Sequence, residues 1–261
     1  MLRGLYTHRW LLWNFLIRDL RGRYAGSTIG LFWYIIDPLL RLIIYTFVFS
    51  ILFKVKLGNE PGTVSFVAYL FCGLLPWIAF EQALQRSATA ITDNSNLVRK
   101  VVFPSEILPT YLVFSNFIHQ TIALILFLGI LFIIQNPPGI HALSLPIVFL
   151  LQIIFTLGLA WFLSSLNIFF RDTPHVLRAI LMIWFFATPI VYPSSIVPGK
   201  LKFLIKLNPM SHLVDIYRAL LLENHLPNLK GSLFFLLVAL ASFVLGYLVF
   251  KKTKQVFGDL L

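Results

Sequence analysis

Charged residues are scarce in this chain, and their scarcity indicates its class. Of 261 residues, 21 are lysine or arginine and only 10 are aspartate or glutamate, so 12% of the chain is charged and 59% is hydrophobic. Residues 107–170 contain no charged side chain at all. A water-soluble fold needs a charged exterior. The composition therefore excludes a soluble globular domain and indicates an integral membrane protein.

Residues that would support enzyme chemistry are also missing. Cys72 is the only cysteine, which excludes an internal disulfide and a cysteine-rich metal site. The six histidines form no pair at the spacing of metal ligands. Gly199-Lys200 is followed by Leu201, so this stretch is no phosphate-binding loop, and the HExxH and GxSxG motifs are absent. We expect a non-catalytic protein that has no cofactor or metal and takes its energy from a partner or a gradient.

Long apolar runs predict an all-α membrane protein with six spanning helices, because a bilayer core takes about 20 apolar residues per helix. A polar turn at residues 135–139 divides the longest apolar tract in two. The expected spans are residues 27–53, 63–82, 108–134, 144–169, 177–193 and 232–250.

Both termini are expected in the cytoplasm. Six spans put both ends on one side of the membrane, and most lysines and arginines fall on that side. We expect a single membrane domain over residues 1–261: an interface helix at 1–26, a six-span bundle at 27–250 and a cytoplasmic tail at 251–261. The net charge of +11 lies beside the spans, which favours membrane lipids over nucleic acid as partners. No small-residue cleavage site follows the N-terminal arginines, so we expect no cleaved signal peptide.

Three segments outside the spans are predicted to be helical. Residues 9–24 form an amphipathic surface helix with a polar stripe at Asn14, Arg18 and Arg21, and the aromatic side chains Trp10, Trp13 and Phe15 are expected in the acyl boundary. Residues 82–109 are long for a connector and hold a short helix across the cytoplasmic face, which Pro104 and Pro109 separate from the next span.

The third segment, residues 193–230, lies on the outer side. Asn208 is the expected N-cap of a helix with Pro209 at its first position, and Asp215 and Arg218 are spaced to pair. This helix is too apolar for open water. Two placements are open: short re-entrant helices dip into the outer half of the membrane, or they rest on the outer leaflet.

The first span holds the only acid and base deep within an apolar stretch. Asp37 and Arg41 lie one turn apart and are placed to neutralise each other. Either they line a wet path through the bundle, or they extend to the cytoplasmic interface. One helical stripe contains Gly30, Trp33, Tyr34, Asp37, Arg41, Tyr45 and Val48.

Aromatic residues beyond that stripe suit the apolar faces of sugar rings, although interfacial belts and lipid-facing side chains have the same composition. These residues are Phe47, Phe49, Trp77, Phe80, Trp184, Phe185, Phe186 and Tyr192.

Several short motifs, in order along the chain, resemble the ABC-2 type permeases that export polysaccharides. The motifs are RDLRGRYAGS (18–27), GLFW (30–33), DPL (37–39), NLVRKVVFPSEILP (96–109), NIFFRD (167–172), TPIVYP (188–193), NPM (208–210) and Tyr217-Arg218. The resemblance implies a homodimer in the bacterial cytoplasmic (inner) membrane. It also implies two copies of a cytoplasmic subunit that binds ATP and Mg, and a lipid-linked glycan as cargo, O-antigen first among the candidates.

The resemblance further implies roles for individual residues. Contact with the nucleotide-binding subunit is expected at Arg18, Arg21, Arg23, Thr89, Asp93, Asn96, Arg99 and Lys100. The translocation path is expected at Trp33, Tyr34, Asp37, Arg41, Tyr45, Trp184, Phe185 and Tyr192. The outer gate is expected at Asn208, Pro209, Tyr217 and Arg218.

We hypothesise that ATP binding closes the two partner subunits and that the Thr89 to Lys100 segment passes the movement to the spans. Arg41, or the cluster at residues 18–23, then holds the lipid pyrophosphate. Within the same superfamily, teichoic acid, capsule, small lipids and drugs are alternative cargoes. From other classes, a membrane-embedded transferase for lipid-linked sugars and an ion-coupled carrier remain alternatives, although only the first span has buried charge and the acids are spread singly.

Overall fold

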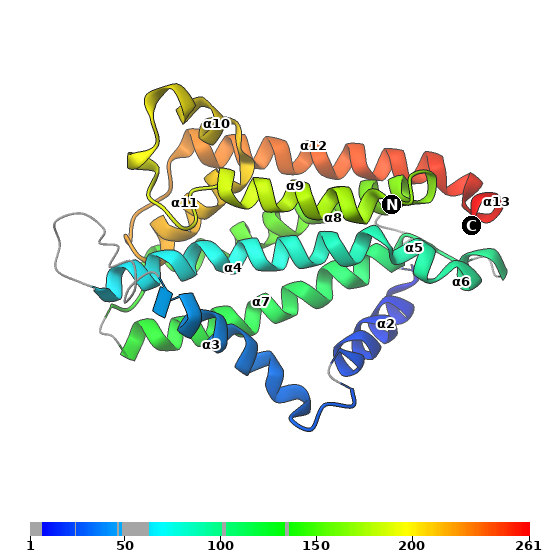
Figure 1. Ribbon diagram of the computed structural model, residues 1–261, viewed down its shortest axis with the longest axis horizontal. Helices are drawn as coiled ribbons and strands as arrows, with labels where there is room; N and C mark the ends of the chain where they lie inside the picture. The colour runs from blue at the N-terminus through cyan, green and yellow to red at the C-terminus, as the bar shows by residue number, and fades with distance from the viewer. Residues whose placement is uncertain (1–6, 24, 46, 49–62, 101–102, 134–135) are drawn as a thin grey trace.

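The computed structural model describes residues 7–23, 25–45, 47–48, 63–100, 103–133 and 136–261, and this part of the chain is helical with no strand. Long helices run side by side, with α5, α6 and α13 at one end of the bundle and α10 and α11 at the other (Figure 1). The elements are α2 Arg9–Gly22, η1 Gly30–Phe32, α3 Trp33–Tyr45, α4 Thr63–Ala88, α5 Ala90–Asp93, α6 Ser95–Lys100, α7 Ile107–Ile133, η3 Ile140–Ser144, α8 Leu145–Phe169, α9 Thr173–Ala187, η4 Ser194–Ile196, η5 Gly199–Leu201, α10 Lys202–Leu207, α11 Pro209–Leu221, α12 Leu229–Thr253, η6 Lys254–Val256 and α13 Phe257–Leu260.

Within the described residues, four helices are long and apolar enough to cross a membrane: Phe66–Ala88, Ile107–Ile133, Ile140–Phe169 and Leu229–Val256. They correspond to the spans predicted at 63–82, 108–134, 144–169 and 232–250, and they confirm the all-helical membrane class. The two other predicted spans correspond to shorter helices, α3 with 13 residues and α9 with 15. The end of the first predicted span, with Phe49, lies outside the described residues.

The helix α4 forms the centre of the bundle, because 72% of its apolar window is buried, against 22% for α12. It packs on α7, α8, α9 and α11. Trp77 and Phe80 of α4 are buried, and the ring of Phe80 stacks on Phe155 of α8 at 5.4 Å. Large aromatic rings therefore fill the space between the central helices.

Two glycines let α8 and α12 approach closely. A Cβ atom on Gly246 would lie 1.9 Å from the carbonyl oxygen of Gly158, and one on Gly158 would lie 2.3 Å from the backbone of Ser242. Small residues at such a crossing allow two helices in a membrane to pack backbone against backbone. The Ser242 hydroxyl also donates to the carbonyl of Phe155 at 3.2 Å.

The surface helix α2 lies at an angle to the bundle and packs on α7 (Figure 1). Trp10 and Trp13 are exposed, as expected for side chains that enter a lipid interface. The prediction for Phe15 is wrong: this ring is buried, 5.3 Å from Tyr111 and 5.8 Å from Phe103. The helix therefore uses one apolar face against protein and presents another outward.

Candidate translocation and coupling sites

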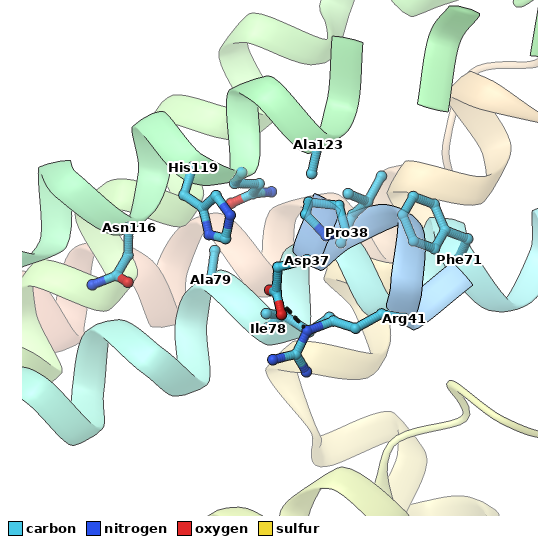
Figure 2. Close-up of a pocket in the computed structure, with 11 residues that line it drawn as sticks. Asp37, Pro38, Arg41, Phe71, Ile78, Ala79, Asn116, His119 and Ala123 are labelled. Carbon is cyan, nitrogen blue, oxygen red and sulfur yellow. Dashed lines mark hydrogen bonds and ion pairs between the residues drawn. The ribbon is translucent and has the colours of Figure 1, made fainter. Parts of the chain in front are cut away.

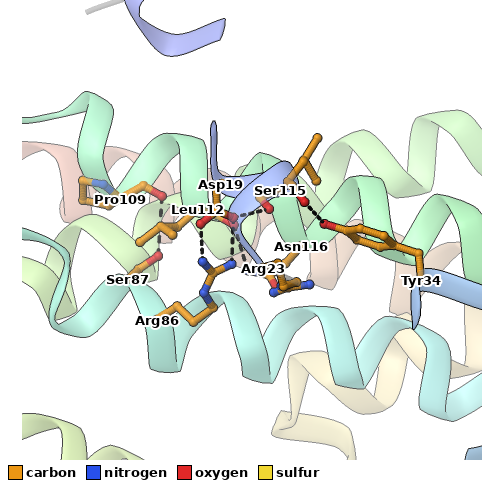
Figure 3. A network of polar contacts seen from close by, with 10 residues as sticks. Asp19, Arg23, Tyr34, Arg86, Ser87, Pro109, Leu112, Ser115 and Asn116 are labelled. Atoms are coloured by element: carbon orange, nitrogen blue, oxygen red, sulfur yellow. Dashed lines mark hydrogen bonds and ion pairs between the residues drawn. The ribbon is translucent and has the colours of Figure 1, made fainter. Parts of the chain in front are cut away.

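An ion pair joins the surface helix to the centre of the bundle. Asp19 of α2 accepts from the guanidinium of Arg86 on α4, with Nη1 to Oδ2 at 3.0 Å and a second contact from Nη2 to Oδ1. The Ser115 hydroxyl of α7 donates to the same carboxylate at 2.5 Å (Figure 3). Burial disfavours the charged carboxylate, but the hydrogen bonds from Arg86 and Ser115 outweigh it, so the pKa of Asp19 lies below its usual value.

Further contacts extend this network towards α3. Arg23 donates to Asn116 of α7 at 2.5 Å, and the hydroxyl of Tyr34 on α3 donates to the carbonyl of Leu20 at 3.0 Å (Figure 3). The ring of Tyr34 also meets His119 edge-on at 5.3 Å. Hydrogen bonds and an ion pair therefore join the C-terminal half of α2 to α3, α4 and α7.

The arginines predicted to meet the partner subunit differ in placement. Arg18 and Arg21 are exposed, and the Arg18 guanidinium lies 4.4 Å above the ring of Phe15. Arg23 is half-buried and points inward to Asn116. Two of the three therefore present their charge outward, and the third joins elements of this chain.

The acid and base of α3 form the predicted pair. Arg41 Nε donates to Asp37 Oδ2 at 3.1 Å, and both side chains are about one-third exposed. They face a small cavity of about 30 Å³ between α3, α4 and α7, whose other polar lining residues are Asn116, His119 and Gln120 (Figure 2). That volume suits one or two water molecules. The Nε2 atom of His119 is buried and has no hydrogen-bond partner among the described residues.

The aromatic residues of the predicted translocation path lie in two places, on α3 and on α9. Trp33 donates to the Ser27 hydroxyl at 2.8 Å on the exposed side of the chain, and Tyr45 is half-buried. Trp184 and Phe185 of α9 instead pack on Trp77, at 6.3 and 5.5 Å. Within the single chain, these aromatic residues therefore form two separate groups, one around α3 and one between α9 and α4.

Residues of the predicted outer gate begin at a well-formed helix cap. The Asn208 side chain accepts from the backbone N–H of Met210 at 3.0 Å and Pro209 follows as the first helical residue, which confirms the predicted N-cap. Asn208 also accepts from Trp184 Nε1 at 2.8 Å and donates to the Thr188 hydroxyl at 2.9 Å. The cap therefore ties α11 to the end of α9. Tyr192, between them, donates its hydroxyl to the carbonyl of Phe186 at 2.7 Å.

Arg218 is buried and serves as a clamp for backbone carbonyls. Its guanidinium donates to the carbonyls of Pro189 at 2.8 Å and Ile190 at 3.0 Å. The Cζ atom of the guanidinium lies 3.4 Å from the ring centre of Tyr69. The predicted partner Asp215 is 3.9 Å away and mostly exposed. The pair exists, but the carbonyls and the ring hold the cation more closely.

Tyr217 takes part in a polar network that sequence reasoning missed. Its hydroxyl donates to Gln152 Oε1 at 2.7 Å and accepts from Gln120 Nε2 at 3.0 Å. Gln152 also donates to the carbonyl of Pro76 at 2.9 Å. Four helices therefore meet through buried hydrogen bonds. The only sequence signal was two glutamines within otherwise apolar spans.

The predicted coupling segment forms two short helices instead of one. Thr89 precedes α5, and Asn94, whose side chain donates to the carbonyl of Ala90 at 2.9 Å, makes the turn before α6. Asp93, Asn96 and Arg99 are exposed, and the backbone of Lys100 ends α6. The charges of Asp93 and Arg99 and the amide of Asn96 are therefore exposed at this end of the bundle.

Together, these features define a helical membrane protein in which α2 and the short helix α5 pack against the long apolar helices. The model of the ABC-2 type transporter family matches residues 11–222. The chain is 32% identical over 261 residues to an O-antigen export system permease protein of Myxococcus xanthus, covering 99% of this chain and 98% of that one. A protein of the same name from Klebsiella pneumoniae is 30% identical over 245 residues, covering 94% and 92%. A polysialic acid transport protein of Escherichia coli is 20% identical over 240 residues, covering 92% of each.

The chain therefore belongs to the ABC-2 type transporter family, as the motifs along its sequence predicted.

Proposed function

We propose that this chain is the membrane-spanning, non-catalytic subunit of an ATP-driven exporter that moves a lipid-linked polysaccharide across the cytoplasmic membrane. The observation that carries this proposal is the similarity along the whole chain to relatives named O-antigen export system permease proteins. O-antigen is therefore the first candidate cargo. Capsular polysaccharide is the second, supported by more distant relatives named for polysialic acid transport and capsule polysaccharide export.

In this proposal the chain forms one membrane domain with six spans and both termini in the cytoplasm of a bacterium. The four long apolar helices supply four spans. The helices α3 and α9, each with adjoining residues, supply the other two. The surface helix α2 lies in the cytoplasmic interface, and α10 and α11 re-enter the outer half of the membrane.

Two copies of the chain pair and border a channel, with α3 and α9 at its wall. Both helices present apolar side chains outward that the single chain does not cover, namely Ile35, Ile43, Ile44, Ile180, Met182 and Ile183. Two copies of an ATP-hydrolysing subunit, which bind ATP and Mg, attach at the cytoplasmic side. Exposed polar residues on α2, α5 and α6 support this attachment.

Within the channel, the Asp37–Arg41 pair receives the lipid pyrophosphate and the aromatic residues guide the sugars. The cation of Arg41 is shared with one carboxylate and remains about one-third exposed, so it keeps donors for a phosphate oxygen. The α11 helix, held by Arg218, closes the outer end until cargo arrives.

Affinity purification of the chain from its native membrane, followed by mass spectrometry, tests the proposal. We expect a stoichiometric partner with a phosphate-binding loop, and ATP hydrolysis in the purified complex. Recovery of the chain alone, from membranes whose export is active, would contradict the proposed exporter and favour a transferase or an ion-coupled carrier.

A further inference from the structure

The Asp37–Arg41 pair lies beside another titratable side chain, His119 of α7. All three residues line the cavity between α3, α4 and α7 (Figure 2). Asp37 and Arg41 are about one-third exposed, whereas His119 is 6% exposed. Among the described residues of the lining, no other side chain is titratable. The pair is therefore accessible from outside the chain and shares its cavity with a buried imidazole.

His119 has a ring nitrogen that the described residues leave unsatisfied. Its Nε2 is buried and has no hydrogen-bond partner among them. The ring is positioned by Tyr34, which meets it edge-on at 5.3 Å and whose own hydroxyl donates to the carbonyl of Leu20. A neutral imidazole accepts one proton, and the resulting cation donates from both ring nitrogens. Protonation of His119 would therefore create a charged donor at Nε2.

The rest of the cavity lining cannot supply such a charge. The amides of Asn116 and Gln120 each form hydrogen bonds with residues outside the lining. The wall from α4 consists of Phe71, Leu75, Ile78 and Ala79. His119 is therefore the side chain of this lining that can offer Asp37 a second cation in place of Arg41.

Three charged side chains lie close enough to act on the His119 ring, namely Arg23, Asp37 and Arg41. While Arg41 pairs with Asp37, two cations face one acid, and burial and repulsion both oppose a further positive charge on the ring. When Arg41 leaves, one cation moves away and the carboxylate loses its partner. The balance of charge then favours an imidazolium at His119.

We propose that His119 is a proton-binding site that supplies Asp37 with a second partner whenever Arg41 leaves the pair. One proton from water binds the imidazole, and the Nε2–H group then donates to the Asp37 carboxylate, directly or through a water molecule in the cavity. The proton returns to water when Arg41 pairs with Asp37 again. His119 is thus a positioning residue, which holds Asp37 beside α7 and leaves Arg41 free to bind another anion.

The role of this proton site in export rests on the proposed function. There, the lipid pyrophosphate is the anion that draws Arg41 away from Asp37. An unpartnered carboxylate beside a bound pyrophosphate would repel it, and a proton on His119 offsets that repulsion. Binding of the headgroup should therefore be accompanied by uptake of a proton.

Nitrogen-15 NMR of the full chain in lipid bilayers, with labelled histidine, measures the charge of the ring directly. The His119 signal is assigned by its loss in His119→Gln. At about pH 6, within the titration range of histidine, we expect the imidazolium fraction of His119 to be at least about threefold higher in Arg41→Met than in wild type. Arg178→Met is the matched control, since Arg178 is an exposed arginine outside the cavity lining, and it should match wild type.

The double variant Asp37→Asn with Arg41→Met separates the carboxylate from other causes. Without the carboxylate, the imidazolium fraction should return to the wild-type value. An imidazolium fraction in Arg41→Met equal to that of wild type would overturn the inference. So would infrared spectra of Arg41→Met that show Asp37 itself carrying the proton.

Inorganic pyrophosphate connects the proton site to export. Added to wild type, it should raise the imidazolium fraction of His119, and this titration carries the test if Arg41→Met does not fold. Pyrophosphate that binds at Arg41 while His119 stays neutral would overturn the inference and leave the headgroup site intact. If pyrophosphate does not bind, the proposed headgroup role fails, and the spectra of Arg41→Met still decide whether His119 is a proton site.

Discussion

Asp19 on the surface helix and Arg86 near the end of α4 form an ion pair between residues 67 positions apart in sequence. Arg86 lies two residues before the end of α4, and α5 follows almost at once. The pair therefore connects α2 to the segment that is proposed to receive movement from the ATP-hydrolysing subunit. Ser115 on α7 fixes the carboxylate from a third side.

Breaking this pair should release α2 from the bundle. We expect Asp19→Asn to weaken the docking of α2 by about 1.5–3 kcal/mol, the usual contribution of hydrogen bonds to a charged group. Hydrogen exchange of the α2 amides measures the effect. Arg21→Gln, an exposed change on the same helix, should leave exchange unchanged. The swap of Asp19→Arg with Arg86→Asp should recover part of the protection, and no difference between Asp19→Asn and wild type would refute the role of the pair.

The same carboxylate predicts a pH dependence. Because the folded pKa of Asp19 lies below its usual value of 3.8, its contribution to stability is fully present above that value and is lost as the pH falls through the folded pKa. The difference in Tm between wild type and Asp19→Asn should thus be constant from about pH 5 to 8 and shrink towards pH 3. A difference that grows on acidification would contradict this assignment.

A larger side chain at Gly158 or Gly246 should destabilise the packing of α8 against α12. Gly246→Leu would drive a side chain into the Gly158 carbonyl, and we expect a loss of at least about 1–3 kcal/mol, or failure to fold. Gly129→Leu on α7 is the control, because nothing lies within 4 Å of a Cβ atom there. Size-exclusion profiles after heating in detergent compare the two, and equal thermal stability would show that the helices do not pack this closely.

Within the buried hydrogen-bond network, Gln152 should contribute more to stability than Tyr217. Gln152→Leu removes the acceptor for the Tyr217 hydroxyl, the donor to the Pro76 carbonyl and both hydrogen bonds with Gln120, whereas Tyr217→Phe removes one hydroxyl. Buried hydrogen bonds in membrane bundles contribute about 0.6 kcal/mol each on average, up to about 1.7. We expect the Gln152 variant to lower Tm more than the Tyr217 variant does. The reverse order would mean that Tyr217 has a role beyond this network.

Arg41 tests the proposed headgroup site. With the charge reversed in Arg41→Glu, Asp37 would meet a second carboxylate in place of its partner, and export should fall at least about tenfold if the cation binds pyrophosphate. Arg41→Lys should retain part of the activity because it keeps the charge. Quantified surface glycan, normalised to the amount of protein in the membrane, gives the readout. Unchanged export with Arg41→Glu would rule out the headgroup role.

Much of the fold was predictable because hydropathy is a local property. The long apolar helices α4, α7, α8 and α12 and the Asn208 cap each follow from neighbouring residues, and so does the Asp37–Arg41 pair at one-turn spacing. The site could be located only in part. Residue types and motifs predicted roles for Arg18 and Arg218, which remain predictions, and the pairing of Arg218 with Asp215. They did not predict the Phe15 ring next to Arg18 or the backbone carbonyls that Arg218 binds.

The contacts that sequence reasoning missed join distant residues. Asp19 and Arg86 each resemble an ordinary interfacial charge when the chain is read locally, and Phe15 resembles a lipid-facing ring until α7 is placed beside it. Arg218 binds backbone carbonyls, which carry no sequence signal. Only the packing of the helices determines such partners.

Reconstitution tests the central claim most directly. The chain and its ATP-hydrolysing partner are placed together in proteoliposomes with a labelled lipid-linked polysaccharide accessible from the outside, where the nucleotide site also faces. The account predicts that ATP transfers the labelled glycan to a compartment protected from added glycosidase, and that a non-hydrolysable ATP analogue does not. Glycan that stays fully accessible while ATP is hydrolysed would contradict the claim that this chain is the permease for it.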